Sequence, residues 1–107
     1  MIRHCVFIRF APEITSGHKE DLFRQIAGLQ SRVPGFLATH AGSNVSPETG
    51  MDKGYSDGFI VDFADAAARD AYLSDTEHQK LGAMLVEAAV GGADGVLVYD
   101  FELADPS

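Results

Sequence analysis

The 107-residue sequence has a single cysteine, few basic residues and no long hydrophobic run. The lone Cys5 cannot form a disulfide within the chain, which fits the reducing cytoplasm. Sixteen acidic residues against eight basic ones give a formal net charge of −8, and nucleic acids and anionic membranes repel such a chain. No apolar run approaches the roughly 18–20 residues that span a bilayer. We therefore expect a cytoplasmic protein with no nucleic-acid or membrane partner.

The composition is that of one folded globular domain. Apolar residues make up 46% of the chain and charged residues 22%, which excludes general disorder. The length is enough for one two-layer core and no second domain. We expect a single domain over residues 2–103, followed by a flexible tail over residues 104–107.

The hydrophobic pattern predicts four strands and three helices. Alternating apolar residues predict strands over residues 2–10, 36–44, 55–63 and 96–103. Apolar residues three and four positions apart, with capping residues before them, predict helices over residues 15–33, 66–73 and 76–90. Counting the last two helices as one helical region, the order is β-α-β-β-α-β. This order predicts an α+β, ferredoxin-like sandwich with a four-stranded antiparallel sheet.

The first and last strands carry apolar residues on both of their faces, although helices on one side of a sheet cover only one face. The apolar side chains expected on the uncovered face are Phe7, Leu97, Tyr99 and Phe101. A lone subunit would expose a larger apolar patch than monomers usually show. We therefore expect a homodimer in which two sheets pack face to face.

Several short motifs along the chain occur together in one known family. They are Ile2-Arg3-His4, Gly54-Tyr55-Ser56-Asp57, Asp70-Ala71-Tyr72-Leu73 followed by His78, and Val98-Tyr99-Asp100-Phe101. With them, the chain resembles the stress-responsive dimeric α/β-barrel (Dabb) family over nearly its whole length. The resemblance implies a homodimer whose two sheets form a barrel with the helices outside.

The resemblance also implies a site. The family includes plant stress-responsive proteins and olivetolic acid cyclase, which closes a linear polyketide without a cofactor. The tyrosine and histidine that do acid–base work in that enzyme match Tyr72 and His78, and its strand histidine matches His4. Another of its pocket histidines falls at Asp57. Some relatives hold a hard cation through backbone carbonyls that match positions around Leu29, Arg32 and Gly35.

Strand alternation gives this site an expected place in the fold. The even face of the first strand and the odd face of the third should point at the helices, which would bring His4 and Asp57 into one layer with Tyr72 and His78. Asp57 could then orient or charge-pair either histidine. The expected apolar body of the pocket is Val6, Ile8, Phe59, Val61, Leu81 and Leu85.

Three functions remain open. We favour a stress-associated homodimer that binds a small apolar or carbonyl-bearing ligand between sheet and helices. The first alternative is a cofactor-independent cyclase, lyase or isomerase that uses Tyr72 and His78 as its acid–base pair. The second is a cofactor-free monooxygenase, by analogy of fold alone. No cofactor and no side-chain metal site are expected.

Overall fold

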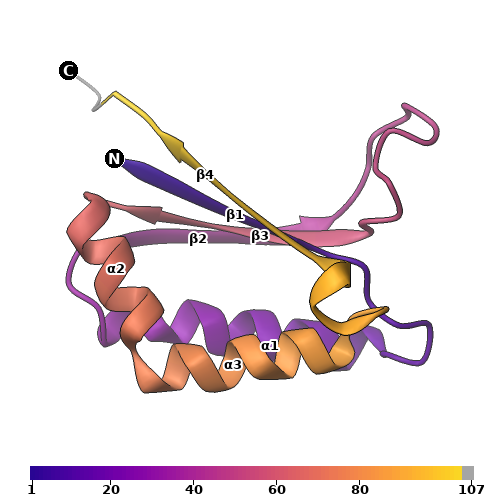
Figure 1. Ribbon diagram of the computed structural model, residues 1–107, viewed down its shortest axis with the longest axis horizontal. Helices are drawn as coiled ribbons and strands as arrows, with labels where there is room; N and C mark the ends of the chain where they lie inside the picture. The colour runs from indigo at the N-terminus through magenta and orange to yellow at the C-terminus, as the bar shows by residue number, and fades with distance from the viewer. Residues whose placement is uncertain (105–107) are drawn as a thin grey trace.

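A computed structural model of the chain describes residues 1–104 and shows helices packed on one face of a single sheet (Figure 1). The strands are β1 (Ile2–Ile8), β2 (Phe36–Ser43), β3 (Asp57–Phe63) and β4 (Val96–Glu102). The helices are α1 (Ser16–Gly28), α2 (Ala66–Ser74) and α3 (Thr76–Ala88), with 3₁₀ turns η1 (Leu29–Ser31) and η2 (Gly92–Gly95). The sheet order is β2-β3-β1-β4, with every neighbouring pair antiparallel. This is the predicted ferredoxin-like fold.

The predicted helix starts are confirmed. The side chains of Thr15, Asp65 and Asp75 each accept a backbone N–H at the start of α1, α2 and α3, which satisfies donors that a helix leaves unpaired. The strand predicted to reach Phe10 ends earlier, at Ile8, because the next residue leaves the ladder. Arg9 instead exchanges backbone hydrogen bonds with Gly95 and Val90.

The core lies between the sheet and the helices. The even face of β1 and the odd face of β3 point into it, as the alternation predicts. Leu22 and Ile26 of α1 and Leu81 and Leu85 of α3 cover them. The other face of the sheet, which we call the free face, has no helix over it (Figure 1).

One glycine allows a close approach that positions α2. Gly35, just before β2, has a left-handed φ of 88°. A Cβ atom at Gly35 would lie 2.7 Å from the Cβ of Ala68 in α2. The turn before β2 therefore lies directly against the helix that carries Tyr72.

Both ends of the domain lie at the same end of the sheet (Figure 1). Ile2 is the register partner of Glu102, and the amino group of Met1 donates a hydrogen bond of 3.1 Å to the carbonyl of Leu103. The predicted flexible tail falls largely on residues 105–107, which are outside the described residues. Within residues 1–104, no helix combines the length and the hydrophobicity required to cross a membrane.

Candidate functional site

Tyr72 and His78 meet at the corner between α2 and α3. Their ring centroids are 4.1 Å apart, and Tyr72 is 0% exposed. The Tyr72 hydroxyl and the His78 Nδ1 atom are buried, and neither makes a hydrogen bond of good geometry among the described residues, although the Leu73 backbone acts on the imidazole and raises its pKa against the effect of burial. Because buried polar atoms are nearly always paired, two adjacent unpaired ones mark this corner as a place where a ligand or water is expected.

His4 of β1 adds a third polar ring. Its centroid lies 5.7 Å from that of Tyr72. His4 Nδ1 lies 2.6 Å from Asp100 Oδ1, and Arg69 Nη1 donates a 3.0 Å hydrogen bond to Asp100 Oδ2. The arginine of α2 thus holds the carboxylate of β4, and that carboxylate orients the histidine of β1.

Aromatic rings enclose the tyrosine on its remaining sides. Phe63 of β3 lies 5.0 Å and Phe36 of β2 lies 5.8 Å from Tyr72, measured between ring centroids. Both phenylalanines are buried in the core. These contacts fix the tyrosine ring and give it apolar surroundings.

Burial sets the protonation of the pair. It raises the pKa of Tyr72 far above its ordinary value, so the phenol keeps its proton and can donate a hydrogen bond. The pKa of His78 is lowered, first by burial and then by the nearby His4. At neutral pH the site therefore offers a neutral phenol and a neutral imidazole, which has one acceptor and one donor nitrogen.

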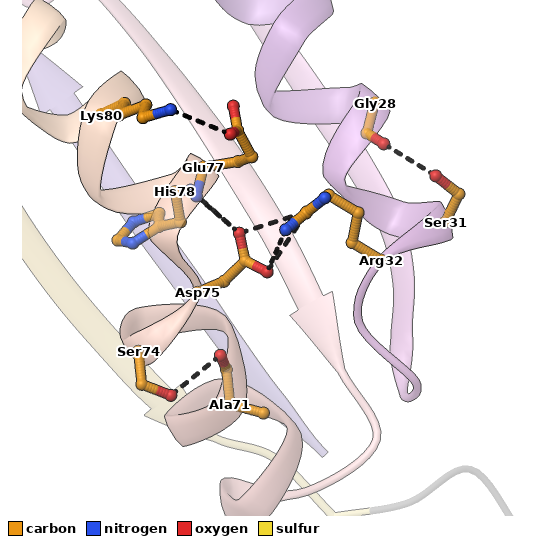
Figure 2. A network of polar contacts seen from close by, with 9 residues as sticks. All are labelled: Gly28, Ser31, Arg32, Ala71, Ser74, Asp75, Glu77, His78 and Lys80. Atoms are coloured by element: carbon orange, nitrogen blue, oxygen red, sulfur yellow. Dashed lines mark hydrogen bonds and ion pairs between the residues drawn. The ribbon is translucent and has the colours of Figure 1, made fainter.

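Asp75 fixes the corner on which this pair sits. Its Oδ1 atom accepts hydrogen bonds from the backbone N–H groups of Glu77 (2.9 Å) and His78 (3.2 Å). Arg32, which follows η1, forms an ion pair of 3.2 Å with the same carboxylate, and this bond comes first among the causes that lower the pKa of Asp75. Figure 2 shows the His78 ring on the side of Asp75 that faces away from Arg32.

The expected place of Asp57 was wrong. In the antiparallel register Asp57 pairs with Ile8, whereas His4 pairs with Val61, about 13 Å further along the strand at roughly 3.3 Å per residue. The Asp57 carboxylate accepts hydrogen bonds from Lys19 (3.0 Å), Ser43 (3.1 Å) and Ser56 (2.7 Å). Asp57 therefore charge-pairs with neither His4 nor His78.

The local contacts of Asp57 determine its charge. Burial acts to raise its pKa, but the hydrogen bonds from Ser56, Lys19 and Ser43 together outweigh burial and lower it. This carboxylate stays ionised and ties the first turns of α1 to the adjoining ends of β2 and β3.

The six apolar residues expected to line the pocket lie in one core cluster, each at most 5% exposed. They are Val6, Ile8, Phe59, Val61, Leu81 and Leu85. They lie on the predicted side of the sheet, and their role in ligand binding stays a prediction.

Two surface hollows lie at the other end of the sheet, near Asp57. One, of about 570 Å³, lies on the free face beside the β2–β3 loop and includes Phe7, Gly42 and Gly58. The other, of about 550 Å³, lies between α1 and β2. Neither is lined by Tyr72 or His78.

Sequence reasoning missed two residues of the site, Asp100 and Arg69. Asp100 is a charged residue within the apolar run of the last strand and lies on the same face as His4, its register partner. An acidic residue at such a position is a signal in the sequence. Nothing in the sequence marks Arg69, which is one of the two charged residues on α2.

We looked for side chains that could bind a metal ion together. Within residues 1–104, no group of three His, Cys, Asp or Glu side chains lies close enough together to hold an ion. The carbonyls of Leu29 and Gly35 accept backbone hydrogen bonds from Arg32 and Ala64. The backbone-carbonyl cation near Gly35 stays a prediction.

Comparison with known proteins agrees with the fold. The family model described as the stress responsive A/B barrel domain matches residues 2–103. A search of curated protein sequences finds no match. A dimeric ferredoxin-like protein of unknown function from Jannaschia sp. CCS1 is 33% identical over 95% of this chain and 98% of its own, with a TM-score of 0.87.

Two more distant structures share the fold alone. A Dabb family protein with a ferredoxin-like fold from Mesorhizobium loti is 21% identical, over 97% of each chain, with a TM-score of 0.70. A hydroxynitrile lyase from Passiflora edulis is 14% identical over 99% of this chain and 95% of its own, with a TM-score of 0.80.

Proposed function

Because this chain belongs to the stress-responsive A/B barrel domain family, we propose that it is a homodimer in which each subunit binds a small, uncharged ligand at Tyr72 and His78. The observation that carries the ligand site is the pair of buried, unpaired polar atoms that two adjacent rings carry, Tyr72 Oη and His78 Nδ1. Leaving a buried polar group unpaired costs about 1–3 kcal/mol. A ligand that pairs both atoms removes that cost.

The charge state of the site selects the class of ligand. A phenol kept protonated by burial donates to a carbonyl or hydroxyl oxygen, and a neutral imidazole accepts from a hydroxyl or donates to a second acceptor. The surrounding rings of Phe36 and Phe63 suit an apolar body. A carbonyl compound with an aliphatic or aromatic tail meets both demands, whereas a carboxylate would bring an unpaired charge into the core.

The free face supports the homodimer. Phe7, Leu97, Tyr99 and Phe101 lie on it, and each is 37% exposed or more. An apolar patch of this kind marks an interaction surface. The Jannaschia protein, which is similar over nearly the whole chain, is described as dimeric.

Acid–base catalysis at the same corner is the second candidate, and the Arg69–Asp100–His4 chain favours it. In this mechanism His78 takes a proton from a carbon or hydroxyl of the substrate while Tyr72 donates a hydrogen bond to the carbonyl oxygen. The oriented His4 holds the substrate's other polar group. The Passiflora neighbour is a lyase, and cofactor-independent lyase, cyclase or isomerase chemistry fits such a set.

The binding test is an NMR titration of the ¹⁵N-labelled protein with benzaldehyde and hexanal, with hexanoate as the charged comparison. We expect the two aldehydes to shift the resonances of Tyr72, His78 and their neighbours, and hexanoate to leave them unmoved. Tyr72→Phe and His78→Gln should weaken the response.

Two matched variants control the titration. Tyr55→Phe removes a hydroxyl from the β2–β3 loop, and His18→Gln removes an exposed imidazole from α1; both should respond like the wild type. The ligand site would be disproved if the aldehydes shifted no resonance at the α2–α3 corner, or if Tyr72→Phe and His78→Gln bound as tightly as these controls.

A further inference from the structure

The pair of rings at Tyr72 and His78 is closed off from solvent. Tyr72 is 0% exposed, so its hydroxyl does not touch water. The two hollows described above lie at the other end of the sheet, and neither is lined by Tyr72 or His78. A ligand can therefore reach the tyrosine hydroxyl only if some part of the structure beside it moves.

The sheet side of the pair is firmly held. His4, Phe36 and Phe63 contact the Tyr72 ring from β1, β2 and β3. His4 and Phe63 lie in strands that hydrogen-bond to a neighbour on each side. Moving these strands would break the ladder hydrogen bonds of the core, which is the last part of a domain to open.

The α2–α3 corner, residues 70–79, is anchored less firmly. Ala68 and Tyr72 are the buried residues of α2. At the start of α3, every residue from Thr76 to Lys80 is half-buried or exposed. A segment with so little buried surface opens at a lower free energy than the sheet does, so the corner is the part expected to move.

Hydrogen bonds within the corner make it one body. The backbone N–H of Asp75 donates a 3.2 Å hydrogen bond to the carbonyl of Tyr72. The Asp75 carboxylate accepts one from the N–H of His78 (3.2 Å), and its carbonyl accepts one from the N–H of Gln79 (3.0 Å). Tyr72 and His78 therefore keep their relative position when the corner moves, and the space that opens lies between them and His4 of the sheet.

An exposed ion pair ties the corner to the segment that follows the first helix. Arg32 Nε and Nη2 each lie 3.2 Å from Asp75 Oδ2. The Arg32 side chain is 46% exposed and that of Asp75 is 15% exposed, so water and salt reach the pair. Figure 2 shows Arg32 on the side of Asp75 away from the His78 ring. The ion pair thus holds the corner from outside the ligand site.

We propose that the α2–α3 corner is a gate over the ligand site and that the ion pair between Arg32 and Asp75 is its latch. The proposal rests on the ligand site proposed above and adds how a ligand enters it. With the latch formed, the corner lies on the sheet and covers Tyr72. With the latch broken, the corner moves outward, and the ligand enters between His4 and the two rings of the corner. Arg32 is a positioning residue, because it acts on the site through Asp75.

Such a latch opposes ligand binding. A ligand that occupies only the open state binds with an apparent dissociation constant equal to the intrinsic one divided by the open fraction. Exposed ion pairs typically shift an equilibrium by about twofold to fivefold. Removal of the latch should raise the open fraction and tighten binding by about that factor, whereas loss of a residue that merely supported the fold would weaken binding.

The test is the NMR titration with hexanal, carried out on Arg32→Met. Methionine keeps an aliphatic chain and removes the guanidinium, and the Asp75 carboxylate still caps α3. We expect the dissociation constant of hexanal, from the shifts of the corner resonances, to fall by about twofold to fivefold. Line-shape analysis should assign the change to faster association with an unchanged dissociation rate, because the bound state has no latch to lose.

Two variants control the comparison. Arg24→Met removes an arginine of α1 that pairs with Asp21 at 3.4 Å on the exposed side of the helix, and it should bind hexanal like the wild type. Arg32→Lys restores a cation opposite Asp75 and should return the dissociation constant at least part of the way to the wild-type value. Circular dichroism of each variant checks that the subunit remains folded.

Salt tests the latch in the unaltered protein. Raising sodium chloride from about 0.01 M to about 1 M shortens the screening length from about 30 Å to about 3 Å and weakens an exposed ion pair, whereas hexanal carries no charge. The ratio of the wild-type dissociation constant to that of Arg32→Met should therefore fall toward unity as salt is added. The ratio removes any effect of salt on hexanal itself, because both proteins share it.

The failures can be told apart. If the aldehydes shift no corner resonance in wild type or in Arg32→Met, the ligand site is disproved and the gate with it. The gate alone is overturned if wild type binds hexanal but Arg32→Met binds it equally or more weakly. It is also overturned if Arg24→Met tightens binding as much as Arg32→Met does, or if salt leaves the ratio of the two dissociation constants unchanged.

Discussion

The ring of Tyr72 lies against the ring of His78, with 4.1 Å between centroids, and each ring carries a buried polar atom with no partner among the described residues. The tyrosine lies in the last turn of α2 and the histidine in the first turn of α3, and the Asp75 cap between the two helices fixes their separation. The backbone of the corner thus holds together two polar atoms that form no hydrogen bond with each other. The two unpaired atoms lower the stability of the folded subunit, and a ligand that pairs with them recovers that free energy on binding.

Removal of the tyrosine hydroxyl should therefore leave the subunit at least as stable as before. In Tyr72→Phe the hydroxyl that finds no partner is gone and the ring packing remains, so the free energy of unfolding in urea should be unchanged or rise by about 1 kcal/mol. Tyr72→Ala, which also removes the ring, should lose about 3–5 kcal/mol. A loss of more than about 1 kcal/mol in Tyr72→Phe would show that the hydroxyl has a stabilising partner, such as a tightly held water.

His78 should make stability depend on pH in a defined window. Burial lowers its pKa in the folded protein, so the unfolded chain binds the proton more tightly, and stability falls as pH drops below about 6.5, the unfolded value. The slope contributed by this single group is at most about 1.4 kcal/mol per pH unit. Urea titrations between pH 8 and pH 5 should show a shallower loss for His78→Gln than for wild type, while His18→Gln on α1 keeps the wild-type slope. Equal slopes in all three proteins would mean that His78 is solvated in the folded state.

Asp57 should matter for stability and not for the ligand. Asp57→Ala removes the acceptor of three hydrogen bonds and leaves the ammonium of Lys19 without its partner, which should cost about 3–5 kcal/mol. Lys19→Met should cost less, because both serines still bind the carboxylate. Neither change should alter the aldehyde titration at Tyr72. If Lys19→Met stayed folded but lost the aldehyde response, the Asp57 end of the sheet would have to belong to the ligand site.

The same carboxylate gives a second pH window. Its folded pKa is lowered, so its contribution is present above the unfolded value of about 3.9 and is lost as pH falls through the lower, folded value. Wild type should therefore lose stability more steeply than Lys19→Met in this acid range. Parallel curves for the two proteins below pH 4 would contradict the assignment.

Gly35 should not tolerate alanine. The substitution places a Cβ atom 2.7 Å from that of Ala68 and forces a left-handed φ on a residue with a side chain, and we expect a loss of about 2–3 kcal/mol in thermal or urea unfolding. Gly28→Ala, in the helix and with open space around it, should instead stabilise by about 0.5–1 kcal/mol. Adding Ala68→Gly to Gly35→Ala should recover the part of the loss that comes from the clash.

The sequence alone was enough to predict which face of each strand is buried and where the helices begin. Alternation along residues 2–8 and 57–63 separates buried from free positions because the two faces of a strand repeat with a period of two. Thr15 and Asp65 could be recognised, and the third cap could be narrowed to Ser74 or Asp75, because capping depends on a side chain one position before the helix.

The position along a strand was harder to predict than the face. Asp57 was expected beside His4 because both lie on buried faces, but antiparallel pairing brings the start of β3 to the end of β1. The same rule brings Asp100, near the end of β4, to the start of β1 and to His4. The acidic partner of the histidine was thus present in the sequence, at a position that only the strand register identifies.

Ile2 and Glu102 are paired on neighbouring strands, so the two ends of the domain meet beside each other at one end of the sheet. A short glycine-serine linker could therefore close the chain into a ring, and new ends could be opened in the exposed β2–β3 loop without cutting any strand or helix. A permuted chain of this kind would keep the α2–α3 corner in one unbroken segment. The new chain ends would lie beside the hollow at Gly42 on the free face. The free face and the ligand site at Tyr72 and His78 could then be engineered separately.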